Sequence, residues 1–312
     1  MPPINVRSPG TVPTVPSTSP STSPVRAPVA VSTPGVSRPA DVFVPSTASA
    51  SFFPPGPRRW GSWAWNTSQV TTPTALESLL AAQKSAGATE LYFNAYPLLG
   101  SESFIQSAVT RSCATGLKPQ LLLGSPEWIE PQTRPWLEKS IITPLKTIRD
   151  RVPAAAVQRL PVHLDVEPHA TGPLTPQKMR DYLDTLSWFS SQLGPGFSLQ
   201  VDIPAWYQGQ KVDGKDFTQE ILQRVDGVTL MAYERSAQQV LADVAPTLAQ
   251  AAKLGKQAMV AVEVGPQYAQ LGLGTQSEVR KFLAQLDAGL ADKPGYGGCA
   301  LHDLDKLRLL PL

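Results

Sequence analysis

Two acidic residues that could take part in acid–base chemistry lie within the stretch Pro161–His169, which reads PVHLDVEPH. Side chains alternate between the two sides of an extended strand, so His163, Asp165 and Glu167 would share one side and the apolar residues between them the other. Pro168 cannot donate a hydrogen bond to a neighbouring strand, and it therefore predicts that the strand ends with Glu167 at its carboxyl end. Paired carboxyl groups of this kind can protonate a leaving group and stabilise developing charge, as in glycosidic bond hydrolysis.

The elements that would position this stretch alternate regularly along the chain. Short apolar runs predict strands, and amphipathic segments between them predict helices. The expected strands cover 60–65, 90–95, 118–123, 161–167, 198–203, 227–233, 257–263 and 297–302, and the expected helices cover 74–86, 101–115, 136–152, 175–193, 217–224, 237–254 and 276–291. Eight strand–helix units over about 250 residues predict an α/β protein with a (β/α)8 TIM barrel over 58–312, whose eighth helix is short or absent.

In such a barrel, functional side chains gather at the carboxyl ends of the strands. The polar residues expected there, besides the pair on the fourth strand, are Asn94, Asp202, Tyr233, Glu234, Glu263 and His302. Trp65 and Trp206 also follow strand ends. Flat aromatic rings stack on the apolar faces of sugars and carboxylates bind their hydroxyl groups, so this set favours a carbohydrate site.

Other readings of these residues remain open. Asp165 and Glu167 could be a structural hydrogen-bonded pair, although carboxylates are rarely buried without partners. His163, Asp165, His169, Glu263 and His302 are residue types that could ligate a metal, but no His-Glu-x-x-His motif is present. The sequence also contains no phosphate-binding glycine loop or dinucleotide fingerprint. We therefore expect neither a metal nor another cofactor.

Composition narrows the classes of partner. Hydrophobic residues make up 42% and charged residues 17% of the 312-residue chain, and residues 58–312 carry 24 basic and 24 acidic side chains. A neutral domain without a basic cluster argues against nucleic acid, and no apolar run is long enough for a membrane span. Cys113 and Cys299 are expected to be buried free thiols. We expect a monomer.

The first 57 residues have a different character, because they hold 14 of the 32 prolines among many serines and threonines. Such a segment cannot bury enough apolar surface to fold, so we predict a disordered linker over 1–57. Its mucin-like composition favours a secreted, periplasmic or cell-surface protein, although the first 30 residues lack the features of a signal peptide.

The strand ends resemble glycoside hydrolase barrels of two kinds. Chitinase-type enzymes carry Asp-x-Asp-x-Glu on the fourth strand and Met-x-Tyr-Asp on the sixth, which are similar to His163-x-Asp165-x-Glu167 and Met231-Ala232-Tyr233-Glu234. This resemblance implies that Glu167 is the general acid, that Asp165 orients it, and that Tyr233 donates to an N-acetyl group that acts as nucleophile. His163 and Glu234 replace aspartates of that pattern.

The second resemblance is to retaining barrels with glutamates on strands four and seven. Glu167 before Pro168 is similar to their Asn-Glu-Pro, with Val166 in place of the Asn, and this likeness implies that Glu263 is the nucleophile. The chain also resembles a family of uncharacterised bacterial glycoside-hydrolase-like barrels. The leading hypothesis is thus a hydrolase acting on an oligosaccharide or polysaccharide, and the alternative is a non-catalytic carbohydrate-binding barrel.

Overall fold

The computed structural model describes residues 51–53, 58–67 and 70–312. Most of the predicted disordered segment therefore lies outside the described residues. Residues 51–53 contact the barrel domain, since the ring of Phe53 stacks on Trp60 with ring centroids 5.2 Å apart. Within the described part of the chain, no helix is both long enough and apolar enough to cross a membrane.

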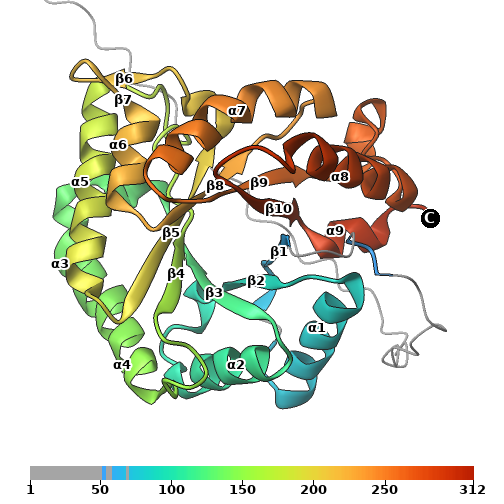
Figure 1. Cartoon of the computed structure of the whole chain (residues 1–312). Helices are drawn as coiled ribbons and strands as arrows, with labels where there is room; N and C mark the ends of the chain where they lie inside the picture. Colours follow the sequence, from blue (N-terminus) through green and yellow to red (C-terminus); the bar gives the residue numbers. More distant parts are fainter. Residues whose placement is uncertain (1–50, 54–57, 68–69) are drawn as a thin grey trace, which may run out of the picture. The chain divides into compact units, whose positions relative to one another are not determined.

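Eight parallel strands form a closed barrel in the order β1-β10-β9-β8-β5-β4-β3-β2, which confirms the predicted fold (Figure 1). These strands are β1 (Arg59–Ala64), β2 (Glu90–Asn94), β3 (Lys118–Leu123), β4 (Leu160–Leu164), β5 (Phe197–Pro204), β8 (Gly227–Met231), β9 (Ala258–Glu263) and β10 (Tyr296–His302). A small antiparallel hairpin of β6 (Lys211–Val212) and β7 (Lys215–Asp216) follows β5. The sequence patterns did not predict this hairpin.

Helices pack around the outside of the barrel. They are α1 (Pro73–Ala86), α2 (Glu102–Ala114), α3 (Arg134–Leu137), α4 (Thr143–Arg151), α5 (Pro176–Leu193), α6 (Phe217–Arg224), α7 (Ala237–Lys253), α8 (Gln276–Leu290) and α9 (Leu304–Leu309). The long helix predicted over 136–152 is interrupted by a π-helical segment, Glu138–Ile142, which separates α3 from α4. The eighth helix is short, as expected, because α9 has six residues.

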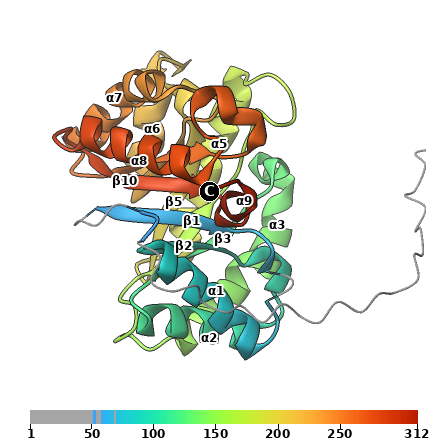
Figure 2. The ribbon, with the colours of Figure 1, turned by 90° about the vertical axis from the view of Figure 1, so that its right-hand side faces the viewer.

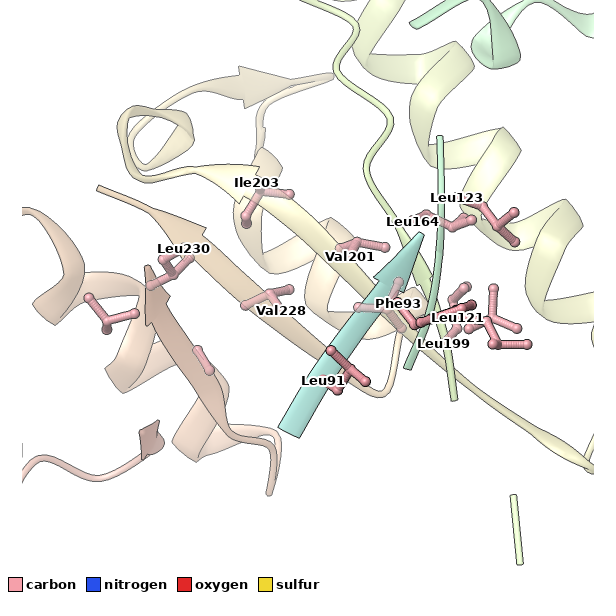
Figure 3. Close-up of a cluster of buried hydrophobic side chains, with 14 of the residues drawn as sticks. Leu91, Phe93, Leu121, Leu123, Leu164, Leu199, Val201, Ile203, Val228 and Leu230 are labelled. Carbon is pink, nitrogen blue, oxygen red and sulfur yellow. The ribbon is translucent and has the colours of Figure 1, made fainter. Parts of the chain in front are cut away.

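Two apolar layers hold the strands in place. Outward-facing residues of β2, β3, β4, β5 and β8 pack under the helices, as Figure 3 shows for Leu91, Phe93, Leu121, Leu123, Leu164, Leu199, Val201, Ile203, Val228 and Leu230. A smaller cluster, which includes Trp63, Tyr92 and Leu122, fills the interior. Burial of each such side chain stabilises the folded state by roughly 1.5–3 kcal/mol. Because successive residues of a strand point alternately to the helices and to the interior, both faces of the strands are held by packing.

The barrel closes where the first strand pairs with the last. β1 runs parallel to β10, with Arg59 opposite Gly298 and Ser62 opposite Leu301, and the two lie side by side in Figure 2. A Cβ on Gly298 would lie 2.0 Å from the carbonyl oxygen of Arg59, and the φ of Gly298 is 138°. Only glycine permits this approach, so the seam depends on it.

The two cysteines are free and belong to different elements. Cys299 is buried in β10, where burial raises the pKa of its thiol to about 12. Cys113 is only half-buried in α2, which corrects the expectation that both thiols are buried.

Candidate active site

The pair on the fourth strand lies just beyond the end of β4. The strand ends at Leu164, and the backbone N–H of Asp165 donates to the carbonyl of Leu123 at 2.8 Å. A Cβ on Gly124 would lie 1.9 Å from the carbonyl oxygen of Asp165, so a glycine after β3 lets the two chain segments approach. The extended part of this stretch is therefore shorter than predicted, and Asp165 and Glu167 occupy the loop at the carboxyl end of the barrel.

The pKa values of both carboxyl groups of this pair are raised. Burial, followed by the charges of Asp202 and Glu167, raises the pKa of Asp165 well above its usual range. Burial and the charge of Asp202 also raise the pKa of Glu167, whereas His302 acts in the opposite direction. The Glu167 side chain is 34% exposed, with its Oε1 3.7 Å from Nε2 of His169, so a ligand could reach it. A half-buried carboxylic acid is a suitable proton donor.

Glu263 has the opposite electrostatic environment. It is the last residue of β9, and its Oε1 accepts a hydrogen bond from Nζ of Lys306 at 2.6 Å while its Oε2 accepts one from the Tyr268 hydroxyl at 2.7 Å. Nδ1 of His302 lies 3.6 Å from Oε1. His302, then Lys306 and Tyr268, lower the pKa of Glu263 to about 2 despite partial burial. Glu263 is therefore an ionised carboxylate at neutral pH.

His302 is fixed by its neighbours at the end of β10. The indole N–H of Trp65 donates to Nε2 of His302 at 2.7 Å, and the ring of Tyr233 stacks on the imidazole with ring centroids 5.5 Å apart. Because Nε2 accepts, a neutral imidazole carries its proton on Nδ1, the nitrogen nearest Glu263. Trp65, Tyr233 and His302 thus form a packed aromatic support beside that carboxylate.

A cavity of about 390 Å³ opens at this end of the barrel. The predicted site residues that line it are Glu167, Trp206, Tyr233, Glu234 and Glu263. The Trp206 side chain is 45% exposed, which leaves its ring available for stacking. The cavity therefore places a carboxyl group with a raised pKa and an ionised carboxylate against the same space as an exposed indole.

The remaining predicted residues do not line the cavity. Asn94 supports neighbouring loops, because its amide donates to the Trp65 carbonyl at 3.2 Å and its Oδ1 accepts from the Tyr96 N–H at 3.3 Å. Asp202 is fully buried in β5 and contacts His163. Asp165 is largely buried as well, and its Oδ1 has no hydrogen-bond partner among the described residues.

Several residues at the site were not identified from the sequence as site residues. Arg235 lines the cavity, and Lys306 and Tyr268 hold Glu263. Lys306 belongs to α9, whose N-cap is Asp303. A basic residue one turn into the helix that follows a strand ending in histidine is the signal that could have indicated Lys306.

The residue types that could ligate a metal do not gather into one site in the described part of the chain. Among residues 51–53, 58–67 and 70–312, no three His, Cys, Asp or Glu side chains converge in a way that could hold a metal ion. Both ring nitrogens of His163 are engaged by Gln120 and Asp202 at 2.8 Å.

A second cavity of about 600 Å³ lies at the opposite, amino-terminal end of β3 and β4. It is larger, and its lining includes Cys113, Lys118 and Arg159 but no carboxylate. It lacks an acid or base suited to hydrolysis, so the smaller cavity is the better candidate for an active site.

Comparison with known proteins gives structural matches only. No protein family model matches the chain, and no curated protein sequence matches it. A monomeric β-xylosidase from Caulobacter crescentus is similar in structure, with a TM-score of 0.53 and 15% identity over 80% of this chain and 59% of the xylosidase chain. A chitinase from Chromobacterium violaceum gives a TM-score of 0.52 and 11% identity over 80% of this chain and 95% of its own. A chitinase from Rhizomucor miehei gives a TM-score of 0.50 and 13% identity over 80% of this chain and 95% of the chitinase chain. These similarities show that the chain shares the (β/α)8 barrel fold with the three enzymes.

Proposed function

We propose that the protein is a glycoside hydrolase with Glu167 as general acid and Glu263 as nucleophile. The observation that carries this proposal is that both carboxyl groups line one cavity while their pKa values are shifted in opposite directions. Glycoside hydrolysis needs one protonated and one ionised carboxyl group, and differing environments are how enzymes supply them.

The two groups would act in sequence. Glu167 donates its proton to the glycosidic oxygen as that bond breaks, and Glu263 attacks the anomeric carbon to form a covalent glycosyl ester. Glu167, now ionised, takes a proton from water as the water oxygen attacks the anomeric carbon, which releases the sugar and regenerates both groups. Lys306 and Tyr268 hold Glu263 in place, and Trp206 offers its exposed ring to a sugar face.

The chitinase-type resemblance assigns a different nucleophile, the N-acetyl group of the substrate. In that variant of the proposal, Asp165 and Tyr233 orient this group, with Asn94, Asp202, Glu234 and His302 completing the substrate-binding surroundings. Substrates with and without N-acetyl groups separate the two routes, since only the first class would be cleaved by substrate assistance. In either case we propose an oligosaccharide or polysaccharide substrate and a monomeric protein acting outside the cytoplasm.

Replacing Glu167 by glutamine tests the proposal, because the amide keeps the shape but cannot donate an acidic proton. Reducing-sugar release from bacterial and fungal polysaccharides should fall by about 10²–10⁴-fold in Glu167→Gln. Glu77→Gln, on the exposed surface of α1, is a matched control that should retain full activity. Unchanged turnover in Glu167→Gln would exclude Glu167 as the acid.

One observation favours a non-catalytic carbohydrate-binding barrel as the second candidate. Both oxygens of Glu263 already accept hydrogen bonds, as expected of a carboxylate that serves only to hold the loops. This candidate predicts an inactive wild type that binds oligosaccharides, with binding lost in Trp206→Ala or Trp65→Ala and retained in Glu167→Gln.

A further inference from the structure

A chain of hydrogen-bonded polar side chains crosses the barrel interior, and none of its members has a role in the two-carboxylate hydrolysis proposed above. Its members are Arg59, Glu90, Gln120, His163 and Asp202, which come in order from the adjacent strands β1, β2, β3, β4 and β5. We call these five residues the barrel relay. Arg59 and Glu90 are the first residues of β1 and β2, whereas Asp202 is the sixth residue of β5. The barrel relay therefore runs from the amino-terminal end of the barrel toward its carboxyl end.

Each member of the barrel relay contacts the next. Nη1 of Arg59 lies 3.3 Å from Oε1 of Glu90, and Nε2 of Gln120 lies 2.8 Å from Oε2 of Glu90. Nδ1 and Nε2 of His163 then lie 2.8 Å from Oε1 of Gln120 and from Oδ1 of Asp202, respectively. Glu90, Gln120, His163 and Asp202 are all buried.

The direction of these hydrogen bonds follows from the charge at one end. Glu90 pairs with Arg59, so its carboxylate only accepts, and the amide nitrogen of Gln120 must face it. The carbonyl oxygen of Gln120 therefore faces His163 and accepts the proton of Nδ1. The 2.8 Å contact between Nε2 and Asp202 needs a proton of its own, because two acceptors would repel each other at that distance.

Two aromatic rings and one carboxyl group border the ring of His163. The ring of Tyr92 lies against it with centroids 4.6 Å apart, and the ring of Trp63 lies 6.5 Å away. Aromatic rings attract cations, and an ionised Asp202 neutralises the charge directly.

Other titratable groups face Asp202 from several elements. They are Tyr92 on β2, Asp165 and Glu167 beyond β4, Tyr182 on α5 and Tyr233 beyond β8, and the charge of Asp202 raises the pKa of each of them, after burial. Oδ2 of Asp202 is buried and has no hydrogen-bond partner among the described residues.

We propose that His163 carries protons on both ring nitrogens and forms a buried ion pair with Asp202, oriented by Gln120, Glu90 and Arg59. Asp202 lies two residues before Pro204, which lines the cavity together with Glu167, so the pair is a positioning device that acts on the Glu167 carboxyl from beneath the cavity. Its structural part stands alone, and its consequence for turnover rests on the proposed function.

Nitrogen NMR of the ¹⁵N-histidine-labelled full chain tests the ion pair directly. The chain contains three histidines, so the His163 signals are those that remain in both His169→Gln and His302→Gln. At pH 7.5, wild-type His163 should show two ring N–H protons that exchange slowly with water. Asp202→Asn should remove the proton on Nε2, because the asparagine amide can donate to that nitrogen instead. A single ring N–H on wild-type His163 would overturn the proposal, even if His163→Gln and Asp202→Asn failed to fold.

The pH profile of hydrolysis tests the positioning role. Glu167 must be protonated to act as the acid, so its pKa sets the alkaline limb of kcat/KM. Removing the Asp202 charge in Asp202→Asn should move that limb to lower pH, whereas removing the cation in His163→Gln should move it to higher pH. Thr247→Val, which changes a buried residue of α7, is the control and should leave the limb in place.

Shifts in the same direction in both variants would overturn the positioning role, since a merely structural defect has no reason to reverse sign. The absence of hydrolysis in wild type would overturn the proposed function instead, and the NMR result on His163 would still decide the ion pair.

Discussion

The ion pair between Lys306 and Glu263 contributes to the free energy of unfolding by an amount that follows from the pKa of Glu263. His302, Lys306 and Tyr268 together lower the pKa of Glu263 to about 2, from an ordinary value of 4.5. At about 1.4 kcal/mol per pKa unit, this difference corresponds to roughly 3 kcal/mol for the whole set. Lys306 is 40% exposed and therefore screened by water, so we assign about 1 kcal/mol to its ion pair.

Replacing Lys306 by methionine should therefore lower the free energy of unfolding at pH 7 by about 1 kcal/mol, which is a fall in Tm of about 2–4 °C for a domain of this size. The folded-state pKa of Glu263 is depressed. The stabilisation is thus complete above pH 4.5 and is lost as the pH falls through about 2. The difference in Tm between wild type and Lys306→Met should accordingly shrink as the pH is lowered from 5 to 2.5.

Calorimetry of both proteins across this pH range measures the effect. Arg308→Met is a matched control, because it removes the same charge from the same helix but breaks only an exposed pair with Asp305 at 3.6 Å. Its Tm should change by less than half as much, with little dependence on pH. Equal shifts in both variants, or a Lys306→Met effect that is undiminished at pH 2.5, would contradict this prediction.

Three further predictions concern the cavity and the barrel interior. Trp206→Ala should weaken oligosaccharide binding by about 5–30-fold with an unchanged Tm, because the ring is 45% exposed and contributes contact rather than core packing; titration calorimetry would measure this, and full affinity would contradict it. Asp165→Asn should raise Tm more at pH 8 than at pH 4. The pKa of Asp165 is raised by burial, so the folded state loses stability as the pH rises above the ordinary value of 3.8, and a pH-independent difference would argue against this cause. Gly61→Ala should lower stability by about 1–3 kcal/mol in denaturant melts, since its Cβ would lie 2.6 Å from the buried hydroxyl of Tyr92; a neutral effect would mean that the interior is looser than described.

The fold could be predicted from the sequence because each barrel strand is buried on both faces. Strands such as β3, with its Leu121-Leu122-Leu123 run, read as continuous apolar segments, and the helices between them carry one apolar stripe. The break between α3 and α4 was missed because the apolar pattern continues through the π-helical segment.

Positions at the strand ends were predictable to within a few residues, whereas contacts between side chains were not. The apolar run of the seventh predicted strand placed Glu263 at the end of that strand, and β9 ends at Glu263 in the structure. That Lys306 and Tyr268 reach this carboxylate depends on how two loops fold, which no local pattern encodes. The polar residues Glu90 and Gln120 likewise fall at inward positions of their strands, but parity alone does not reveal that they contact each other.

The pairing of β1 with β10 links the surroundings of Glu263 to the closure of the barrel. β10 pairs with both β1 and β9 and so closes the barrel. Its last residue, His302, and Lys306 of the following helix α9 lie beside Glu263. Residues that are distant along the polypeptide must therefore meet before the Glu263 carboxylate acquires its cationic neighbour. Opening of this pairing would remove the cationic neighbours of Glu263 together with the barrel shape, so under the proposed function a partly opened molecule should have no activity.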